Sequence, residues 1–560
     1  MNRIIGKFLL TVILFTGLAF NSGAQNSIKE EVPNGWHLKD SKSDGYYGIS
    51  LNKAYEFLKS KKLKSKTVIV AVIDSGIDTA HEDLRPVLWT NPGEIQGNGI
   101  DDDKNGYIDD VHGWNFIGGK DGKNVEQDTY EAARVYHKFK SKWEGKAVYV
   151  DTLSKTENDE YEMWKKSETE VAGNSKSGGM ELIFLKRAYN AAVKSDSIIR
   201  KAMGKEKYTG EDLEKLTSDD AEVKRSKLTL MTLFQGNDAM DNSNQDFLEG
   251  FGDYLRGEEE KANASETPPK AYRAEIVKDN YNDFNDRFYG NNDLMVSNKS
   301  ALHGTHVSGI IGAVRNNGMG VDGIADNVKI MMIRAVPDGD EHDKDIALAI
   351  RYAVDNGAKV INMSFGKSYS PEKKWVDDAI KYAESKDVLL VHAAGNDAKN
   401  IDEAWNFPSP VSIEDGKRPA NWVTVGASGD PKTGGLVTGF SNYGKNEVDV
   451  FAPGIKIYSS LPGESNYGNL QGTSMASPVV AGLAALILEY FPLLSASQVK
   501  MVIENSVQKP GMNVTNPETD EETKLSDISR TGGIINAYDA IKLAASLKGE
   551  RKVIAEKKGF

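Results

Sequence analysis

Apolar residues follow two different spacings along the chain. Continuous apolar and β-branched runs, such as Thr67–Ile73 and Val388–His392, are typical of strands buried on both faces of a parallel sheet. Between such runs, Asp345–Asn356 and Trp375–Ser385 carry apolar residues at helical spacing. This alternation predicts an α/β fold with a largely parallel central sheet flanked by helices.

The stretch between residues 120 and 284 has a different amino-acid composition. Glu, Lys, Asp and Ser dominate it, and its apolar residues, as in Glu181–Met203, lie at helical spacing. Thr209–Asp212 has the pattern of a helix capping box. We therefore expect a mostly helical insertion here. Both a neutral decoration and a device that restricts access to a cleft fit this pattern, because loop insertions cost little closure entropy.

The first residues have the layout of a secretory signal peptide. Arg3 and Lys7 precede the apolar run Phe8–Phe20, and small residues follow at Ser22 and Ala24. A membrane anchor is the alternative, but the run is shorter than the ~20 apolar residues that span a bilayer. We expect cleavage after Ala24, export to the periplasm or the outside of the cell, and no stable membrane span.

Composition narrows the classes of function. Hydrophobic residues make up 39% of the chain and charged residues 27%, as in ordinary globular proteins. A net charge of −13 gives no attraction to phosphates, so we expect no nucleic-acid partner. The chain has no cysteine, which excludes disulfides, thiolate nucleophiles and cysteine metal sites.

Three segments carry side chains suited to catalysis. Asp74 ends a predicted buried strand, at the sheet edge where active groups of α/β proteins gather. His303 begins a helix of small residues. Ser474 begins an apolar helix, whose N-terminus favours a nucleophile and a developing oxyanion. Taken singly, Asp74 also fits a turn aspartate, and Ser474 fits a helix N-cap.

His303 and His306 raise the alternative of a metallohydrolase. A zinc peptidase helix has two histidines four positions apart with a glutamate between them. Here the histidines are three positions apart, and glycine and threonine lie between them. The pattern therefore favours His306 as a helix histidine that is hydrogen-bonded inside the protein.

Together the three segments resemble the signature blocks of the subtilisin-like serine proteases, or subtilases. The blocks are VIDSGID (72–78), HGTHVSG (303–309) and GTSMASP (472–478), in the order Asp, His, Ser that distinguishes this family from other triad enzymes. LLVHAAGN (389–396) resembles the family's oxyanion strand, and INMSFG (361–366) its substrate-binding strand. The resemblance covers roughly residues 34–119 and 284–543.

The resemblance implies a secreted serine endopeptidase with a subtilisin-like fold. Ser474 would be the nucleophile of an acyl-enzyme mechanism, His303 the base, Asp74 its orienting carboxylate and Asn396 the oxyanion donor. The implied substrate-binding residues are Ser364, Phe365, Gly366, Ala394 and Gly395. The implied partners are protein or peptide substrates of a monomeric enzyme, and the chemistry requires no cofactor.

The expected organisation has five parts. They are a signal peptide (1–24), an N-terminal lead-in (25–65), a discontinuous peptidase domain (66–119 and 285–545), the helical insertion (120–284) and a C-terminal tail (546–560). The insertion departs from compact subtilases, because Asp74 and His303 are 229 positions apart. A catalytically silent binding protein with the insertion as its working part is therefore the main alternative.

A calcium site is a further expectation. Oxygen-bearing groups alternate along the loop after Asp101, and a glycine stands at the sixth place, as in the first half of an EF-hand loop. The twelfth place holds His112 instead of a bidentate glutamate, and a solvated acidic turn is the alternative. The predicted ligands are Asp101, Asp103, Asn105, Tyr107 and Asp109. By resemblance, Asp83 with the loop Val314–Val321 is a weaker second candidate.

Overall fold

The computed structural model describes residues 32–237, 239–240, 242–463 and 466–551. The predicted signal peptide lies outside these residues, as do residues 552–560 of the predicted tail. Contacts within the chain define two compact units. One contains Thr129–Lys270, and the other contains Ser27–Asp128 and Ala271–Phe560. The expected limits of the insertion, residues 120 and 284, remain predictions.

A seven-stranded parallel sheet organises the larger unit. Its strand order is β2-β3-β1-β4-β5-β6-β7, and every neighbouring pair is parallel. The strands are β1 (Val68–Asp74), β2 (Gly113–Asn115), β3 (Val328–Arg334), β4 (Val360–Met363), β5 (Leu389–Ala393), β6 (Trp422–Ser428) and β7 (Val450–Pro453). The order reverses between β1 and β4, and open α/β sheets bind ligands at the carboxyl ends of the strands at such a point.

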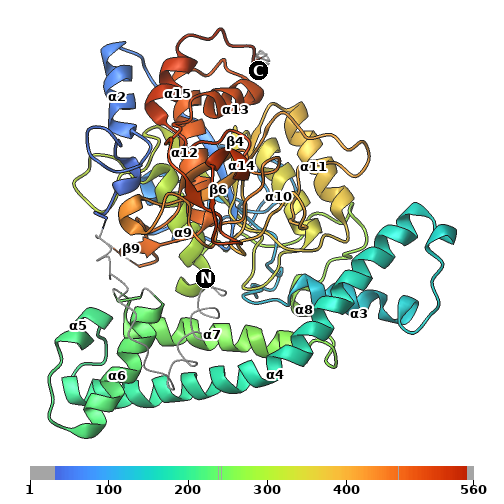
Figure 1. Ribbon diagram of the computed structural model, residues 1–560. Coiled ribbons are helices and arrows are strands. Elements are labelled where there is room, and N and C mark those ends of the chain that lie inside the picture. The colour runs from blue at the N-terminus through green and yellow to red at the C-terminus, as the bar shows by residue number, and fades with distance from the viewer. Residues whose placement is uncertain (1–31, 238, 241, 464–465, 552–560) are drawn as a thin grey trace. The chain divides into compact units, whose positions relative to one another are not determined.

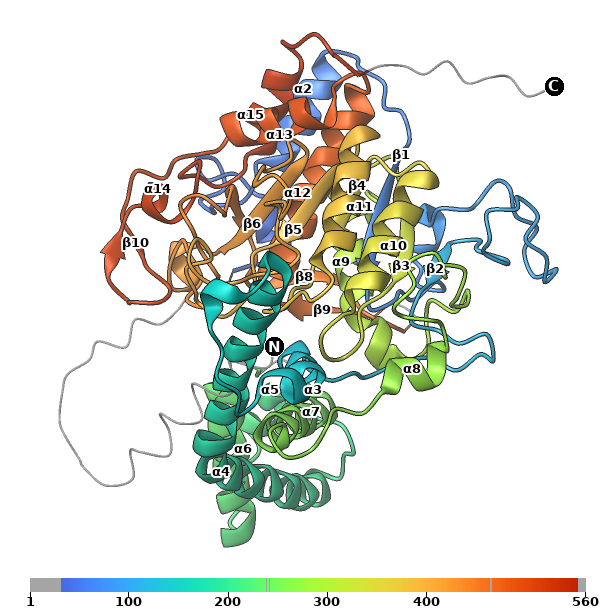
Figure 2. The same ribbon diagram turned by 90° about the vertical axis from the view of Figure 1, so that its right-hand side faces the viewer.

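Helices cover both faces of this sheet (Figures 1 and 2). The helices of this unit are α2 (Leu51–Ser60), α8 (Tyr272–Val277), α9 (Asn298–Gly312), α10 (Asp343–Asp355), α11 (Lys373–Ser385), α12 (Thr473–Tyr490), α13 (Ala496–Asn505), α14 (Leu525–Ile528) and α15 (Ala537–Ala544). Side chains of β1 alternate between two cores. Val70 and Val72 pack in the core that contains α9 and α12, whereas Ala71 and Ile73 pack in the core that contains α10 and α11.

Helix α12 forms the centre of the first core. Within the described part of the chain it is the one helix long and apolar enough to cross a membrane, and 89% of it is buried inside the structure. Burial among β1, β4, β5 and β6 explains its apolar composition. A short antiparallel hairpin of β8 (Ile457–Ser460) and β9 (Tyr467–Leu470) packs against α9.

The smaller unit is helical and has a core of its own. Its helices are α3 (Glu131–Trp143), α4 (Lys155–Met203), α5 (Gly210–Lys215), α6 (Ala221–Gly236) and α7 (Asn244–Asn263). Phe234 of α6 and Phe247 of α7 stack with ring centroids 4.6 Å apart. Buried Asp196 of α4 accepts hydrogen bonds from the Tyr208 hydroxyl and the Asn244 amide, at 2.9 and 2.7 Å.

The strands and helices predicted from spacing are confirmed. The runs at Thr67–Ile73 and Val388–His392 are β1 and β5, and the helical patterns at Asp345–Asn356 and Trp375–Ser385 are α10 and α11. The pattern at Glu181–Met203 is only the second half of α4, which begins at Lys155. The first half of α4 also lies in the stretch predicted to be mostly helical, but its apolar residues do not delimit a helix because charged residues outnumber them.

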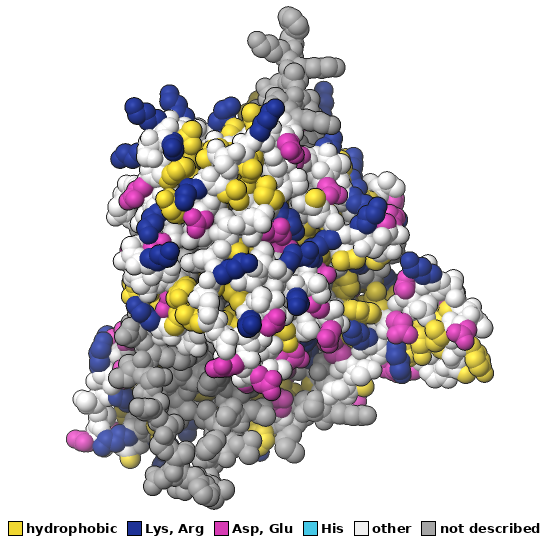
Figure 3. Space-filling view, turned by 45° about the horizontal axis from the view of Figure 1, so that its top comes forward, with side chains coloured by type: hydrophobic (Ala, Val, Ile, Leu, Met, Phe, Trp, Pro, Cys, Tyr) yellow, Lys and Arg dark blue, Asp and Glu magenta, His cyan; other side chains and the backbone are white. Residues whose placement is uncertain are grey.

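The surface carries both signs of charge. The chain has 69 basic and 82 acidic residues. On the face drawn in Figure 3, Lys and Arg side chains are interspersed with Asp and Glu side chains. The net charge of −13 is therefore not a single acidic patch on this face.

Candidate active site

Asp74 and His303 are in direct contact. Asp74 ends β1 with a side chain 2% exposed, and His303 belongs to α9. His303 Nδ1 lies 2.8 Å from Asp74 Oδ1. An ionised carboxylate only accepts hydrogen bonds, so Nδ1 is the protonated nitrogen of this contact, and in the neutral ring the lone pair is then on Nε2. A general base needs this tautomer.

The absence of a side chain at Gly304 permits this contact. A Cβ at this position would lie 2.1 Å from the Gly76 carbonyl oxygen and 3.2 Å from Asp74 Cβ. Both distances are shorter than ordinary van der Waals contacts. Helix α9 can therefore reach the end of β1 only because the residue after His303 is glycine.

Ser474 is the second residue of α12. The N-cap of this helix is Gly472, which has a φ of 146°. At the second position the N–H of Ser474 has no carbonyl within the helix to bond. Its Oγ donates to the Ser364 carbonyl at 3.1 Å. Among the described residues no hydrogen bond joins Ser474 to His303. The structure thus places Ser474 against the residue that follows β4, and β4 neighbours the strand that carries Asp74.

Asn396 lies beside the start of α12. Its Oδ1 accepts the Thr473 N–H at 2.8 Å and the Thr473 hydroxyl at 3.0 Å, which leaves the Nδ2 hydrogens for another acceptor. The point that a Cβ of Gly472 would occupy lies 3.5 Å from Asn396 Nδ2, 3.6 Å from Asn396 Oδ1 and 3.6 Å from the Ser474 nitrogen. The Asn396 amide and the Ser474 backbone nitrogen therefore both lie near the position that Gly472 leaves free of a side chain.

The residues predicted to bind substrate follow neighbouring strands. Ser364–Gly366 follow β4, and Ala394–Gly395 directly follow β5, its parallel neighbour. A Cβ at Gly366 would lie 3.9 Å from Asn406 Oδ1, and a Cβ at Gly395 would lie 3.6 Å from it. Asn406 therefore borders both segments. Sequence reasoning missed it because it belongs to a loop without a regular spacing.

A buried histidine supports the first of these segments. His392 Nε2 lies 2.9 Å from the Phe365 carbonyl oxygen. Burial lowers the pKa of His392 to about 4, so the ring is neutral at pH 7 and donates its Nε2–H to this carbonyl. From the sequence, His392 was expected only as part of a strand. The sequence feature that could have singled out His392 is its position as a polar residue inside an apolar strand.

His306 is turned into the protein. Its side chain is fully buried, and Nε2 lies 3.1 Å from the Gly468 carbonyl oxygen of β9. Burial lowers the pKa of His306 to about 3. The prediction of an internally hydrogen-bonded histidine is confirmed.

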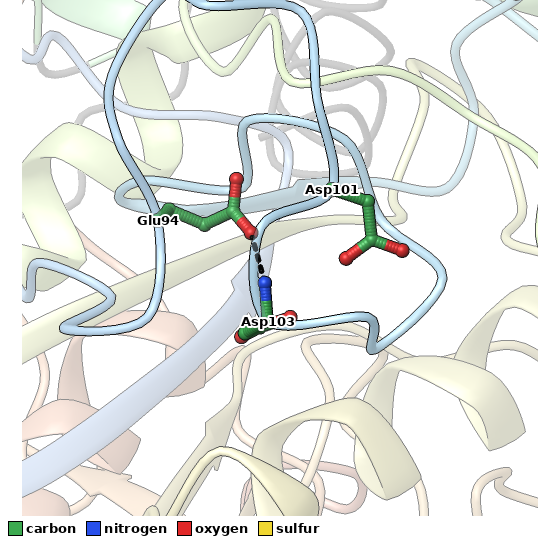
Figure 4. Close-up of side chains that lie close together, drawn as sticks. All are labelled: Glu94, Asp101 and Asp103. Carbon is green, nitrogen blue, oxygen red and sulfur yellow. Dashed lines mark hydrogen bonds between the residues drawn. The ribbon is translucent and has the colours of Figure 1, made fainter.

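The acidic loop brings together a different set from the one predicted. Carboxylate oxygens of Glu94, Asp101 and Asp103 lie within 4.8 Å of one another (Figure 4). Glu94 was not among the predicted ligands. Asp109 accepts the backbone N–H groups of residues 97–99, and the Asn105 side-chain oxygen accepts the N–H of Tyr107. The structure therefore groups two of the five predicted ligands with one unpredicted carboxylate.

Comparison with known proteins gives one family. The model of the subtilase family matches residues 65–524. Thermitase of Thermoactinomyces vulgaris is 37% identical over 246 residues, which are 43% of this chain and 75% of thermitase. A thermophilic serine proteinase of Bacillus sp. (strain AK1) is 42% identical over 186 residues, which are 33% of this chain and 42% of that protein.

Other relatives match over similar stretches. An extracellular protease of Xanthomonas campestris is 36% identical over 226 residues, 37% of this chain and 36% of that protein. The chain thus spans less than half the length of the Bacillus and Xanthomonas proteins. A solved structure of a protease from Pseudoalteromonas arctica is 32% identical, with a TM-score of 0.34 over 43% of this chain and 70% of that one.

Proposed function

Because the chain belongs to the subtilase family of serine proteases, we propose that it is an endopeptidase whose triad is Asp74, His303 and Ser474. The observation that carries the proposal is the 2.8 Å contact between His303 Nδ1 and Asp74. These residues are 229 positions apart, and His303 is partly exposed whereas Asp74 is buried. Ser474 supports the proposal by its place at the start of α12, where its Oγ donates to the carbonyl of Ser364, the residue that follows β4.

The mechanism follows from the roles of these groups. Ser474 Oγ attacks the peptide carbonyl carbon while His303 Nε2 accepts its proton. The imidazolium then donates this proton to the leaving amine, which leaves an acyl-enzyme ester on Ser474. Water attacks the ester with His303 again as base, and the acid product and the Ser474 hydroxyl are released. Asp74 remains ionised and stabilises the imidazolium throughout.

The oxyanion of each tetrahedral intermediate would occupy the space that Gly472 leaves open. The Asn396 amide and the Ser474 N–H border this space and would donate to the oxygen. Ser364–Gly366 would bind the substrate backbone as an added strand beyond the end of β4. Ala394 and Gly395 would face the substrate side chain on the N-terminal side of the cleaved bond.

The proposal is tested by Ser474→Ala in an assay of casein hydrolysis. We expect the variant to lose hydrolysis and to keep the melting temperature of the wild type, because only one partly exposed oxygen is removed. Ser529→Ala, which removes a buried hydroxyl outside the site, serves as the control and should retain activity. Casein cleavage by Ser474→Ala at the wild-type rate would show that the assignment is wrong. A folded wild type that cleaves neither casein nor a peptide library would favour the silent binding protein.

We also propose a structural calcium ion at Glu94, Asp101 and Asp103. The donor set fits, since Ca²⁺ prefers several carboxylate and carbonyl oxygens. Each of these carboxylates also accepts loop N–H groups, which hold it in place: Glu94 from residues 102, 103 and 109, Asp101 from 105 and 106, and Asp103 from 105. The ion would stabilise the loop and take no part in the reaction.

Calcium titration of the purified protein tests this site. Asp101→Asn should weaken calcium binding and abolish the rise in melting temperature that calcium causes in the wild type. Asp109→Asn changes a loop carboxylate outside the group and should retain both effects. If calcium leaves the melting temperature of the wild type unchanged, or if only Asp109→Asn removes its effect, the proposed ligand set is wrong.

Export is proposed from the N-terminal sequence, which lies outside the described residues. The Xanthomonas relative is named an extracellular protease, which agrees with this proposal. Edman sequencing of the exported protein should begin at Gln25. Activity that stays in the cytoplasm, with residues 1–24 intact, would contradict it.

A further inference from the structure

The carbonyl of Ser474 has a partner that a regular helix would not supply. Pro478 lies inside α12, four residues after Ser474, and it has no N–H to close the helical hydrogen bond. The Ser364 hydroxyl donates to the Ser474 carbonyl instead, at 2.9 Å. Ser364 therefore contacts the proposed nucleophile twice, because its own carbonyl accepts Ser474 Oγ.

Two further buried side chains determine which way the Ser364 hydroxyl points. Asn362 Nδ2 donates to Ser364 Oγ at 2.9 Å, and Ser477 Oγ donates to Asn362 Oδ1 at 2.8 Å. A carbonyl oxygen can only accept a hydrogen bond, so the Ser364 hydroxyl donates its single hydrogen to the Ser474 carbonyl. Ser364 Oγ must then accept the hydrogen bond from the Asn362 amide. This fixes the orientation of the Asn362 amide, whose oxygen then accepts the hydrogen bond from the Ser477 hydroxyl. We call the chain from Ser477 through Asn362 and Ser364 to the Ser474 carbonyl the serine relay.

The serine relay joins β4 to α12 inside the protein. Asn362 and Ser477 are fully buried, and Ser364 is 4% exposed. Ser474 and Ser477 are three positions apart and so share one face of the helix. Because buried polar groups are costly when unpaired, each member keeps its neighbour in a single orientation. The first turn of α12 is thereby held against the strand that precedes the proposed substrate-binding segment.

We propose that Asn362 and Ser477 are positioning residues for the reaction, acting on Ser474 through the Ser364 hydroxyl. Their effect is on the Ser474 backbone, which carries both the nucleophilic Oγ and one of the two N–H groups that border the space at Gly472. The inference rests on the proposed function, since it assigns these residues to the orientation of the nucleophile. It adds two residues that touch neither the substrate nor His303.

The test compares Ser477→Ala and Asn362→Leu with Ser529→Ala. Ser529 is an equally buried serine, and its hydroxyl donates to the Leu525 carbonyl outside the serine relay. We expect kcat for a peptide substrate to fall about tenfold or more in both relay variants, with KM nearly unchanged, since small displacements of a nucleophile have effects of this order. The rate of labelling by a fluorophosphonate should fall in parallel. Ser477→Thr keeps the hydroxyl and should recover most of kcat.

Melting temperatures separate positioning from general destabilisation. The relay variants should lose much more kcat than Ser529→Ala for a similar loss of melting temperature. Relay variants with wild-type kcat, or with a rise in KM alone, would overturn the inference, as would a loss of kcat equal to that of the control. If Asn362→Leu does not fold, the comparison of Ser477→Ala with Ser477→Thr tests the positioning role. A wild type without peptidase activity would instead refute the proposed function itself.

Discussion

At the scale of single residues, the proposed mechanism gives Asn396 both a structural and a chemical task. Its oxygen accepts two hydrogen bonds from Thr473, which attach it to the first residue of α12. Its nitrogen borders the same space as the Ser474 N–H. Substitution by alanine would remove both tasks together. Aspartate keeps the acceptor oxygen and removes only the N–H donors.

Asn396→Asp should therefore lower kcat by about 10²–10³, the typical effect of removing an oxyanion donor from a subtilisin, because a carboxylate oxygen replaces the donor. The variant should bind Thr473 as before, so its melting temperature should stay close to that of the wild type. Peptide hydrolysis and thermal unfolding measured on the same preparation check both expectations. If Asn396→Asp kept the kcat of the wild type, the proposed role of Asn396 as an oxyanion donor would be wrong.

At the scale of elements, the site depends on how closely helices reach strand ends. Helix α9 approaches β1 through Gly304, and α12 is held against β4 through the serine relay. Neither contact depends on the length of the connection between the elements. This explains how a stretch of more than two hundred residues can separate Asp74 from His303 without separating their side chains.

Gly304→Ala should disrupt the Asp74–His303 contact. The added Cβ would lie 2.1 Å from the Gly76 carbonyl oxygen, so α9 must shift away from β1. Displacements near 1 Å cost about 10²-fold in rate, and we expect a loss of kcat of this order together with lower stability. Gly236→Ala is the matched control, since a Cβ at Gly236 in α6 meets nothing within 4 Å. Equal activity and stability of both variants would contradict the close approach.

Much of the fold follows from the sequence, because strands buried on both faces appear as continuous apolar runs such as Thr67–Ile73. The order of the three chemical segments also predicted that Asp74 and His303 would meet. Side-chain partners across elements were not predictable. Asn362 and Ser477 bond only because α12 lies on β4 in one particular position. Glu94 joins Asp101 through the folding of the loop, and no spacing within residues 101–109 points to it.

At the scale of the whole molecule, buried ionisable groups make stability depend on pH. Glu489 of α12 is fully buried, and burial together with nearby Asp326 raises its pKa from 4.5 to about 9. The folded protein therefore keeps this proton up to about pH 9, whereas the unfolded chain releases it near pH 4.5. The stabilising contribution of the neutral acid is complete below pH 4.5 and is lost as the pH rises from 4.5 to about 9.

Glu489→Gln should make stability less sensitive to pH across this window. Glutamine keeps an oxygen for the Asn327 N–H and carries no titrating proton. The free energy of unfolding of the wild type should fall relative to the variant by up to about 1.4 kcal/mol for each pH unit. Denaturant unfolding between about pH 5 and pH 9, in a Ser474→Ala background that prevents self-digestion, measures this difference. Parallel curves for the two proteins would contradict a neutral Glu489.

The central claim is that Ser474 is a nucleophile activated by His303. Reaction of the folded protein with a fluorophosphonate, followed by mass spectrometry of its peptides, tests this claim most directly. We predict one adduct, on Ser474, whose formation slows by orders of magnitude in His303→Ala. An adduct on another residue, or labelling of Ser474 at the same rate in His303→Ala, would contradict the claim.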